Sequence, residues 1–217
     1  MKAGVLGTGM VGQALAGKLV ELGHEVMMGS RQAGSEKATA WVKAAGGNAR
    51  EGSFRDAAEF GEVVINATSG AASLAALEAA GAENLSGKVL IDVSNPLSPD
   101  SGFPPVLSVC NTDSLGEQIQ RAFPDARVVK TLNTINADVM VNPHLVPGDH
   151  AIFLSGDDAG AKGRVREILE SFGWSGDRIY DLGDISTARG TEMYLAFWLR
   201  VMLASGGPHF NIEIRRA

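Results

Sequence analysis

Three glycines near the amino terminus have the spacing of a loop that binds the phosphates of a dinucleotide. They stand in the stretch Gly7-Thr8-Gly9-Met10-Val11-Gly12, between an apolar run at Ala3 to Leu6 and a helical pattern from Gln13 to Leu22. In such a loop the first glycine permits a tight turn, the second lets the backbone approach the phosphates, and the third lets helix and strand pack closely. The stretch predicts a strand, a turn and a helix whose amino terminus holds a pyrophosphate.

The residues after the next apolar run indicate which dinucleotide binds. Glu25 to Met28 is expected to form the second strand, and Gly29-Ser30-Arg31 follows it. Proteins that bind NAD carry Asp or Glu here, because the carboxylate accepts hydrogen bonds from the ribose 2′-hydroxyl. A hydroxyl and a guanidinium instead suit a 2′-phosphate. We therefore predict NADP(H), with Lys37 adding a second positive charge; the alternative is that Arg31 is a solvated surface residue.

Small and polar residues follow three later strands, which are predicted at Val63 to Ala67, Val89 to Asp92 and Arg127 to Leu132. Ligands of an open α/β sheet bind at the carboxyl ends of its strands, so residues there are expected to line the path to the nicotinamide. Thr68 or Ser69 could also cap the next helix, and the two roles are compatible. The candidates are Ala67, Thr68, Ser69, Asn95, Asn133 and Thr134.

Composition and charge exclude several function classes. The 217 residues are 45% hydrophobic and carry a net charge of −6, which is typical of a globular protein and argues against a nucleic-acid partner. Neither a signal peptide nor an apolar stretch of the roughly 18 residues needed to span a bilayer is visible, so we expect a cytoplasmic protein with no membrane partner. The single cysteine, Cys110, excludes an intrachain disulfide and is interpreted as a packing residue. No metal-ligand spacing is visible.

The order of strand and helix patterns predicts the fold class. Further helices are expected at 35–45, 54–60, 71–80, 114–123 and 158–172, and further strands at 48–50, 151–155 and 178–182. This alternation predicts a Rossmann-type α/β fold with a doubly wound, mostly parallel sheet. We expect residues 1–155 to form the NADP-binding domain and residues 156–217 a small α/β extension.

Two segments are expected to border the second substrate. Leu97 to Asn111 is a long loop near four of the eight prolines, namely Pro96, Pro99, Pro104 and Pro105. Loops of this length usually serve as lids or binding loops. The last helix, Ile185 to Leu203, is apolar on nearly all sides, so we expect it to be buried against the sheet or another subunit. It would form a wall of the acceptor site and the contact of a homodimer.

The nucleotide motifs resemble those of a known family, the NADP-dependent reductases of the deazaflavin coenzyme F420. The nucleotide-binding part of this chain is also similar to the cytosolic reductase domain of the STEAP metalloreductases. The resemblance covers nearly the whole chain. The matching pieces are the glycine stretch at 7–12, Leu22 to Val26, Gly29-Ser30-Arg31 and Val128 to Ile135.

The resemblance also implies roles for particular residues. Asn133 and Thr134 would lie near the place of hydride transfer. Two segments depart from the family pattern, Thr68-Ser69-Gly70 and the loop from Pro96 to Pro105, and both would border the acceptor. The acceptor's identity therefore stays open. The residues implied at the 2′-phosphate are Thr8, Ser30, Arg31 and, in support, Lys37.

Three functions are compatible with these patterns. The first is hydride transfer between NADPH and a flavin or deazaflavin such as F420, which takes the hydride directly and requires no acid–base side chain. The second is a carbonyl or imine reductase, which would need a proton donor. The third is a non-enzymatic NADP(H) sensor. None of the possible proton donors has a recognisable catalytic spacing: they are His24, His144, His150, His209, Tyr180, Tyr194 and Lys130.

Overall fold

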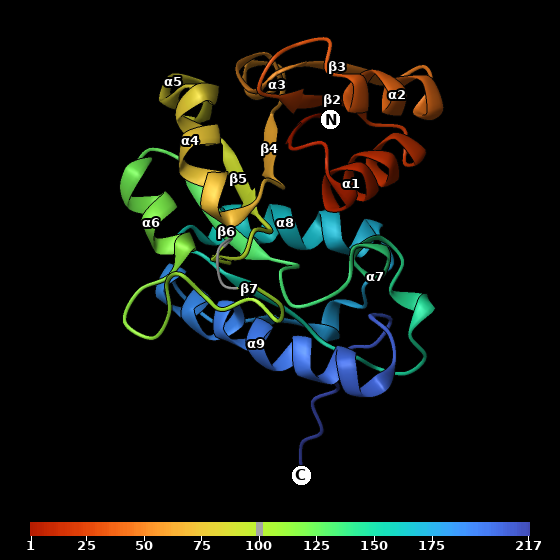
Figure 1. Ribbon diagram of the computed structural model, residues 1–217, viewed down its shortest axis with the longest axis vertical. Helices are drawn as coiled ribbons and strands as arrows, with labels where there is room; N and C mark the ends of the chain where they lie inside the picture. Colours follow the sequence, from red (N-terminus) through yellow and green to blue (C-terminus); the bar gives the residue numbers. More distant parts are fainter. Residues whose placement is uncertain (99–101) are drawn as a thin grey trace.

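Short apolar runs form the strands of one sheet, because helices cover both of its faces. The computed structural model describes residues 1–98 and 102–217, so Pro99 of the predicted loop lies outside the described residues. The strand order is β3-β2-β1-β4-β5-β6-β7-β8 (Figure 1). The strands are β1 (Lys2–Leu6), β2 (Glu25–Ser30), β3 (Ala49–Ser53), β4 (Val63–Asn66), β5 (Val89–Asp92), β6 (Arg127–Thr131), β7 (Ile152–Ser155) and β8 (Ile179–Asp181).

The first six strands are parallel and follow the Rossmann order, which confirms the predicted fold class. The order reverses between β1 and β4, and this switch point is where such folds bind their ligand. The direction of the strands reverses once along the sheet, because β7 pairs with β6 in the antiparallel sense while β8 runs parallel to β7. The carboxyl-terminal extension therefore continues the same sheet.

Helices cover the two faces in separate groups, and strand residues alternate between them: Val5 packs with the first group and Leu6 with the second. Short 3-10 helices lie at Pro143–Leu145, Gly176–Arg178 and Ile185–Thr187. The first group is α1 (Met10–Glu21), α2 (Glu36–Ala45), α7 (Ala137–Val141) and α8 (Ala159–Ser171). The second is α3 (Phe54–Phe60), α4 (Gly70–Ala80), α5 (Ala82–Leu85), α6 (Leu115–Ala122) and the start of α9 (Ala188–Ser205).

Most predicted elements lie where the sequence placed them, and the exceptions are local. The first helix begins at Met10 rather than Gln13, so part of the glycine stretch forms its first turn. Neither α5 nor α7 was predicted from the sequence. Cys110 is exposed, so its interpretation as a packing residue is wrong. Within residues 1–98 and 102–217, no helix has both the length and the apolar character needed to cross a membrane.

The last helix buries one face and exposes the other. Leu195, Trp198 and Leu199 form a small core with Leu97 and Leu107 of the long loop and with Phe210 of the carboxyl-terminal tail. The Trp198 and Phe210 rings stack with centroids 5.4 Å apart. Figure 1 shows α9, in blue, at the end of the molecule away from β2 and β3. Three large apolar side chains of this helix are exposed. They are Met193, Phe197 and Leu203.

Candidate functional site

The three glycines of the first turn meet three different steric demands. Gly7 has φ of 120°, and a Cβ there would lie 2.5 Å from the Ala67 carbonyl oxygen. A Cβ on Gly12 would lie 2.2 Å from the Gly7 carbonyl oxygen, so helix α1 can approach the turn only without a side chain. A Cβ on Gly9 would meet no atom of the described chain within 4 Å. The backbone at Gly9 therefore faces open space, as a phosphate-binding turn requires.

The amino terminus of α1 is suited to an anion. Among residues 1–98 and 102–217 no side chain caps this helix, whose N-cap residue is Gly9, and its first turn carries no carboxylate. The first backbone N–H groups of a helix lack intrahelical acceptors and carry the positive end of the helix dipole. A pyrophosphate would therefore be stabilised at this point.

A cleft of about 1040 Å³ opens beside this terminus, at the carboxyl ends of β1, β2 and β4. Arg31 and Lys37 are both exposed and both line it. Lys37 lies in the first turn of α2, where the helix dipole disfavours a cation unless an anion is bound. One carboxylate, that of Glu36, also lines the cleft. The two cations and the start of α2 suit a phosphate group at the β2 side of the cleft.

Ser30 contributes to this side of the cleft mainly by shaping the loop. Its side chain is only 8% exposed, and its hydroxyl donates a hydrogen bond of 2.6 Å to the Gln32 carbonyl oxygen. The Gly34 amide donates to the Glu51 carboxylate at 2.8 Å, which fixes the other end of the same loop. These two bonds hold the backbone that presents Arg31.

The predicted site residues separate into two groups. Nine of them line the cleft, and the remaining six do not. Met10, Val11 and Gly12 belong to the first turn of α1, where Met10 is 79% exposed. The residues that line the cleft are Gly7, Thr8, Gly9, Ser30, Arg31, Lys37, Ala67, Thr68 and Ser69. Those that do not are Met10, Val11, Gly12, Asn95, Asn133 and Thr134.

Part of the cleft wall could not be predicted from motifs. The alanines of α4 form one side of it, and their small side chains keep the space open. The alanine-rich composition of this helix was the feature of the sequence that could have identified it as a wall of the cleft. The additional lining residues are Gln32, Ala33, Gly34, Ser35, Glu36, Phe54, Ala72, Ala75, Ala76 and Ala79.

Asn95 and Asn133 lie together beyond the cleft, after β5 and β6. The Asn95 side-chain amide donates to the Asn133 carbonyl oxygen at 2.8 Å, and the Asn133 side-chain amide donates to Asn95 Oδ1 at 3.0 Å. This pair joins the ends of the two strands. Thr134 is 3% exposed, and its hydroxyl has no hydrogen-bond partner among the described residues.

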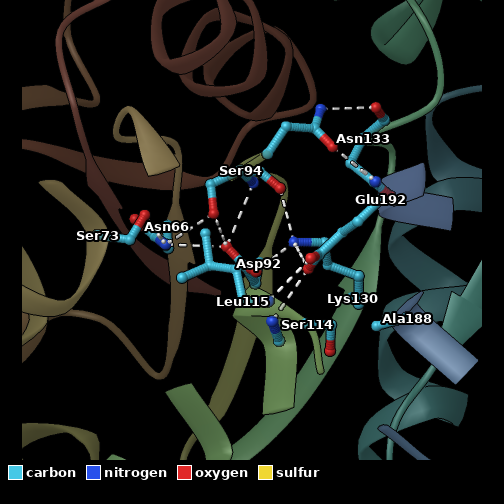
Figure 2. A network of polar contacts seen from close by, with 12 residues as sticks. Asn66, Ser73, Asp92, Ser94, Ser114, Leu115, Lys130, Asn133, Ala188 and Glu192 are labelled. Carbon is cyan, nitrogen blue, oxygen red and sulfur yellow. Dashed lines mark hydrogen bonds and ion pairs between the residues drawn. The ribbon is translucent and has the colours of Figure 1, made fainter. Parts of the chain in front are cut away.

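A fully buried ion-pair network lies directly behind this pair (Figure 2). The Lys130 ammonium lies 2.7 Å from Asp92 Oδ2 and 2.8 Å from Glu192 Oε1, and it donates to the Ser94 carbonyl oxygen at 2.6 Å. Burial alone would lower the pKa of Lys130, but the carboxylates of Asp92 and Glu192 raise it above its ordinary value. The ammonium therefore stays charged and uses all three of its protons.

The network reaches the cleft on one side and two helices on the other. Asp92 Oδ1 accepts from the side-chain amide of Asn66, whose own Oδ1 accepts from the Thr68 hydroxyl at 2.7 Å. The Glu192 carboxylate accepts from the backbone amides of Leu115 and Gly116, which begin α6. Strands β4, β5 and β6 and helices α6 and α9 are thus connected by hydrogen bonds through one buried cluster.

Several of the candidate proton donors are engaged elsewhere. Lys130 is enclosed in the network just described. His150 is buried, with Nε2 2.9 Å from the Pro143 carbonyl oxygen and Nδ1 2.9 Å from the Asn211 side-chain amide. His209 lies 3.0 Å from Asp138. Tyr194 differs, because its buried hydroxyl has no partner among the described residues and burial raises its pKa.

The Rossmann strand order and the cleft at its switch point define a dinucleotide-binding protein. Residues 2–96 match the model of the family described as NADP oxidoreductase, coenzyme F420-dependent. A crystal structure of a protein assigned as an F420-dependent NADP-reductase, from Arthrobacter sp. FB24, is 50% identical, with a TM-score of 0.92 and 99% of each chain covered. The chain belongs to this family of NADP-dependent oxidoreductases.

Two more distant similarities concern parts of longer proteins. Metalloreductase STEAP3 of Rattus norvegicus is 30% identical over 195 residues, which are 88% of this chain and 36% of the relative. This chain thus spans about a third of the length of that curated relative. A reductive aminase from Aspergillus terreus is 20% identical with a TM-score of 0.68, covering 94% of this chain and 62% of its own. At that identity the likeness shows the shared fold.

Replacing Gly12 by Ala is expected to damage both folding and cofactor binding. The new Cβ would overlap the Gly7 carbonyl oxygen, so α1 must move away from the turn. Overpacking of this kind costs about 1–3 kcal/mol of unfolding free energy. Urea unfolding measures the loss of stability, and NADPH titration measures the loss of affinity.

Gly17→Ala is the matched control on the same helix. A Cβ there meets no atom of the described chain within 4 Å outside the helix backbone, so this variant should be as stable as the parent or more stable by about 0.5–1 kcal/mol. Equal effects of the two substitutions would contradict the steric argument.

Proposed function

We propose that this protein transfers a hydride between NADPH and a flavin or deazaflavin acceptor of the F420 kind. The observation that carries the proposal is the cationic side of the cleft, formed by Arg31, Lys37 and the start of α2. It suits the 2′-phosphate that distinguishes NADPH from NADH. Membership of the F420-dependent family and the 50% identity to the Arthrobacter protein favour a deazaflavin as the acceptor.

The chain's own residues would bind and orient rather than transfer protons. NADPH supplies the hydride when it is bound, and the protein must hold the two reacting rings together and keep water away. The turn at Gly7 to Gly12 would fix the pyrophosphate. The ends of β4, β5 and β6 would border the nicotinamide, and α9 with the long loop would border the acceptor. A ring that accepts a hydride directly requires no further proton donor.

One observation favours a second candidate, an imine or carbonyl reductase. The hydroxyl of Tyr194 on α9 is buried without a partner among the described residues, and its raised pKa keeps it protonated. A protonated hydroxyl on the acceptor side could donate to a substrate nitrogen or oxygen.

The preference for NADPH predicts the effect of removing the guanidinium. Arg31→Ala should weaken NADPH binding roughly ten- to a hundredfold, because charge-assisted hydrogen bonds to the 2′-phosphate are lost. Adding Ser30→Asp should repel the phosphate further. NADH affinity should stay within about twofold, as measured by fluorescence titration of both cofactors.

Lys43→Ala is the control for charge, because Lys43 is an exposed cation near the end of α2 that does not line the cleft. It should leave both affinities unchanged. If Arg31→Ala binds NADPH as tightly as the parent does, the assignment of the 2′-phosphate site is wrong.

An acceptor panel tests the reaction itself. The protein is mixed with NADPH and, separately, F420, FMN, FAD, riboflavin, a small imine and a small carbonyl compound, and NADPH oxidation is followed by absorbance. Oxidation with a flavin or deazaflavin is the expected result. Turnover of the imine or carbonyl alone, lost in Tyr194→Phe, would establish the second candidate instead. NADPH binding without any turnover would indicate a sensor.

We also propose that a second copy of the chain covers the exposed face of α9. Met193, Phe197 and Leu203 are 38%, 58% and 51% exposed, and Met193 and Phe197, four residues apart, lie on one face of the helix. Apolar side chains grouped in this way favour association, and a twofold axis would pair each face with itself. A cytoplasmic location is still a prediction from the sequence.

The homodimer is tested by light scattering. The parent should have the mass of two chains, and the double variant Met193→Lys with Phe197→Glu should have the mass of one while keeping its circular dichroism spectrum. A parent mass of one chain across the micromolar range would rule out the dimer.

A further inference from the structure

The ion-pair network behind Asn95 contains charges that the proposed hydride transfer does not use. Lys130, Asp92 and Glu192 have side chains that are 0–1% exposed, so none of them can touch a ligand in the cleft. Burying three charged groups is costly unless each is compensated. Here every charge has a partner, and one of the partners of Lys130 is a backbone atom at the edge of the site.

That backbone atom is the Ser94 carbonyl oxygen, which accepts from Lys130 at 2.6 Å. In a trans peptide the C=O and the following N–H point in opposite directions. With the Ser94 carbonyl directed at Lys130, the Asn95 amide N–H is directed away from the network. Figure 2 shows the dashed line that joins the Ser94 carbonyl oxygen to the Lys130 ammonium. The orientation of this one peptide is thus determined by a buried ammonium.

The Ser94–Asn95 peptide lies on the side of the sheet where the nicotinamide half of a dinucleotide is expected. The 2′-phosphate side is at the end of β2, and the pyrophosphate turn follows β1. A dinucleotide spans the switch point, so its other half extends across the ends of β4 and β5. Asn95 lies three residues after the end of β5 and is joined to Asn133 after β6.

Glu192 connects this arrangement to α9. Its Oε1 is 2.8 Å from the ammonium, and its two oxygens accept from the first two amides of α6. An ion pair also joins α9 to α6, because Arg189 donates two hydrogen bonds to Glu117, at 2.8 and 2.6 Å. Glu192 is linked to Ser94 through Lys130, whereas the Arg189–Glu117 pair has no bond to Ser94 among the described residues, so the two connections between α9 and α6 can be compared.

We propose that Lys130 and Glu192 are positioning residues for the nicotinamide half of the cofactor, acting through the Ser94–Asn95 peptide and the Asn95–Asn133 pair. This proposal rests on the proposed binding of NADPH. It assigns no role to either residue in binding the 2′-phosphate or the pyrophosphate, because those sites belong to β1, β2 and their following helices.

The test compares two ligands that share the adenosine half. NADPH carries the nicotinamide, whereas adenosine 2′,5′-bisphosphate lacks it. In Lys130→Met the Ser94 carbonyl loses its donor, and in Glu192→Gln an amide NH₂ must face the N–H donors of Lys130 or α6. Each variant should weaken NADPH about three- to tenfold, the effect of about one hydrogen bond. Affinity for adenosine 2′,5′-bisphosphate should stay within about twofold.

Arg189→Met is the matched control, since it removes an α9–α6 ion pair that has no bond to the Ser94–Asn95 peptide among the described residues. It should lower the melting temperature and leave both affinities unchanged. Calorimetry gives the affinities, and thermal unfolding gives the stability of each variant. If Lys130→Met does not fold, Glu192→Gln decides the question alone, because it leaves the Lys130–Asp92 pair intact.

The proposal is overturned if Glu192→Gln weakens both ligands equally or neither, or if Arg189→Met changes NADPH binding as much. Failure of the proposed function has a different signature. In that case the parent would oxidise NADPH with no flavin or deazaflavin of the acceptor panel, while the difference between the two ligands would still appear in the variants.

Discussion

A buried ammonium shared by two carboxylates is the constraint on which the carboxyl-terminal half of this protein depends. Lys130 lies on β6, an interior strand of the sheet, and its partners come from β5 and α9. Two carboxylates and one ammonium leave one negative charge, and the first amides of α6 offset it by donating to Glu192. Removing one member of a buried ion pair typically costs about 3–5 kcal/mol. Helix α9 therefore has one docking position that satisfies every charge.

The two halves of the site are built by different means. Backbone geometry forms the phosphate-binding half: a turn with φ of 120° at Gly7, a helix terminus without a side-chain cap, and a loop held by Ser30 and Glu51. Side-chain contacts between distant segments form the other half. Asn95 meets Asn133, and Leu97 and Leu107 pack against α9. The first half rests mainly on short sequence motifs, and the second requires the complete fold.

This difference determines what the sequence could predict. The glycine turn, the Rossmann-type fold class and the cationic loop follow from short-range patterns, and nine predicted residues line one cleft. Asn95 and Asn133 were assigned from their places after strands, but only the folded chain shows that they bind each other. Lys130 stands in an apolar strand, and the sequence names neither of its partners. The direction of β7 also could not be predicted, because the irregular segment before it can reach either edge of the sheet.

The reversed direction of β7 determines at which edge of the sheet α9 starts and at which edge it ends. In a repeating parallel unit each helix starts at the ligand edge and runs back toward the opposite edge. Because β7 and β8 are reversed, α9 starts from the far side, passes Lys130 at Glu192 and continues outward to Leu97 and Leu107. Its 18 residues extend about 27 Å, longer than a strand of this sheet. The reversed strands thereby bring the last helix of the chain against the loop that follows β5, at the carboxyl edge of the parallel strands.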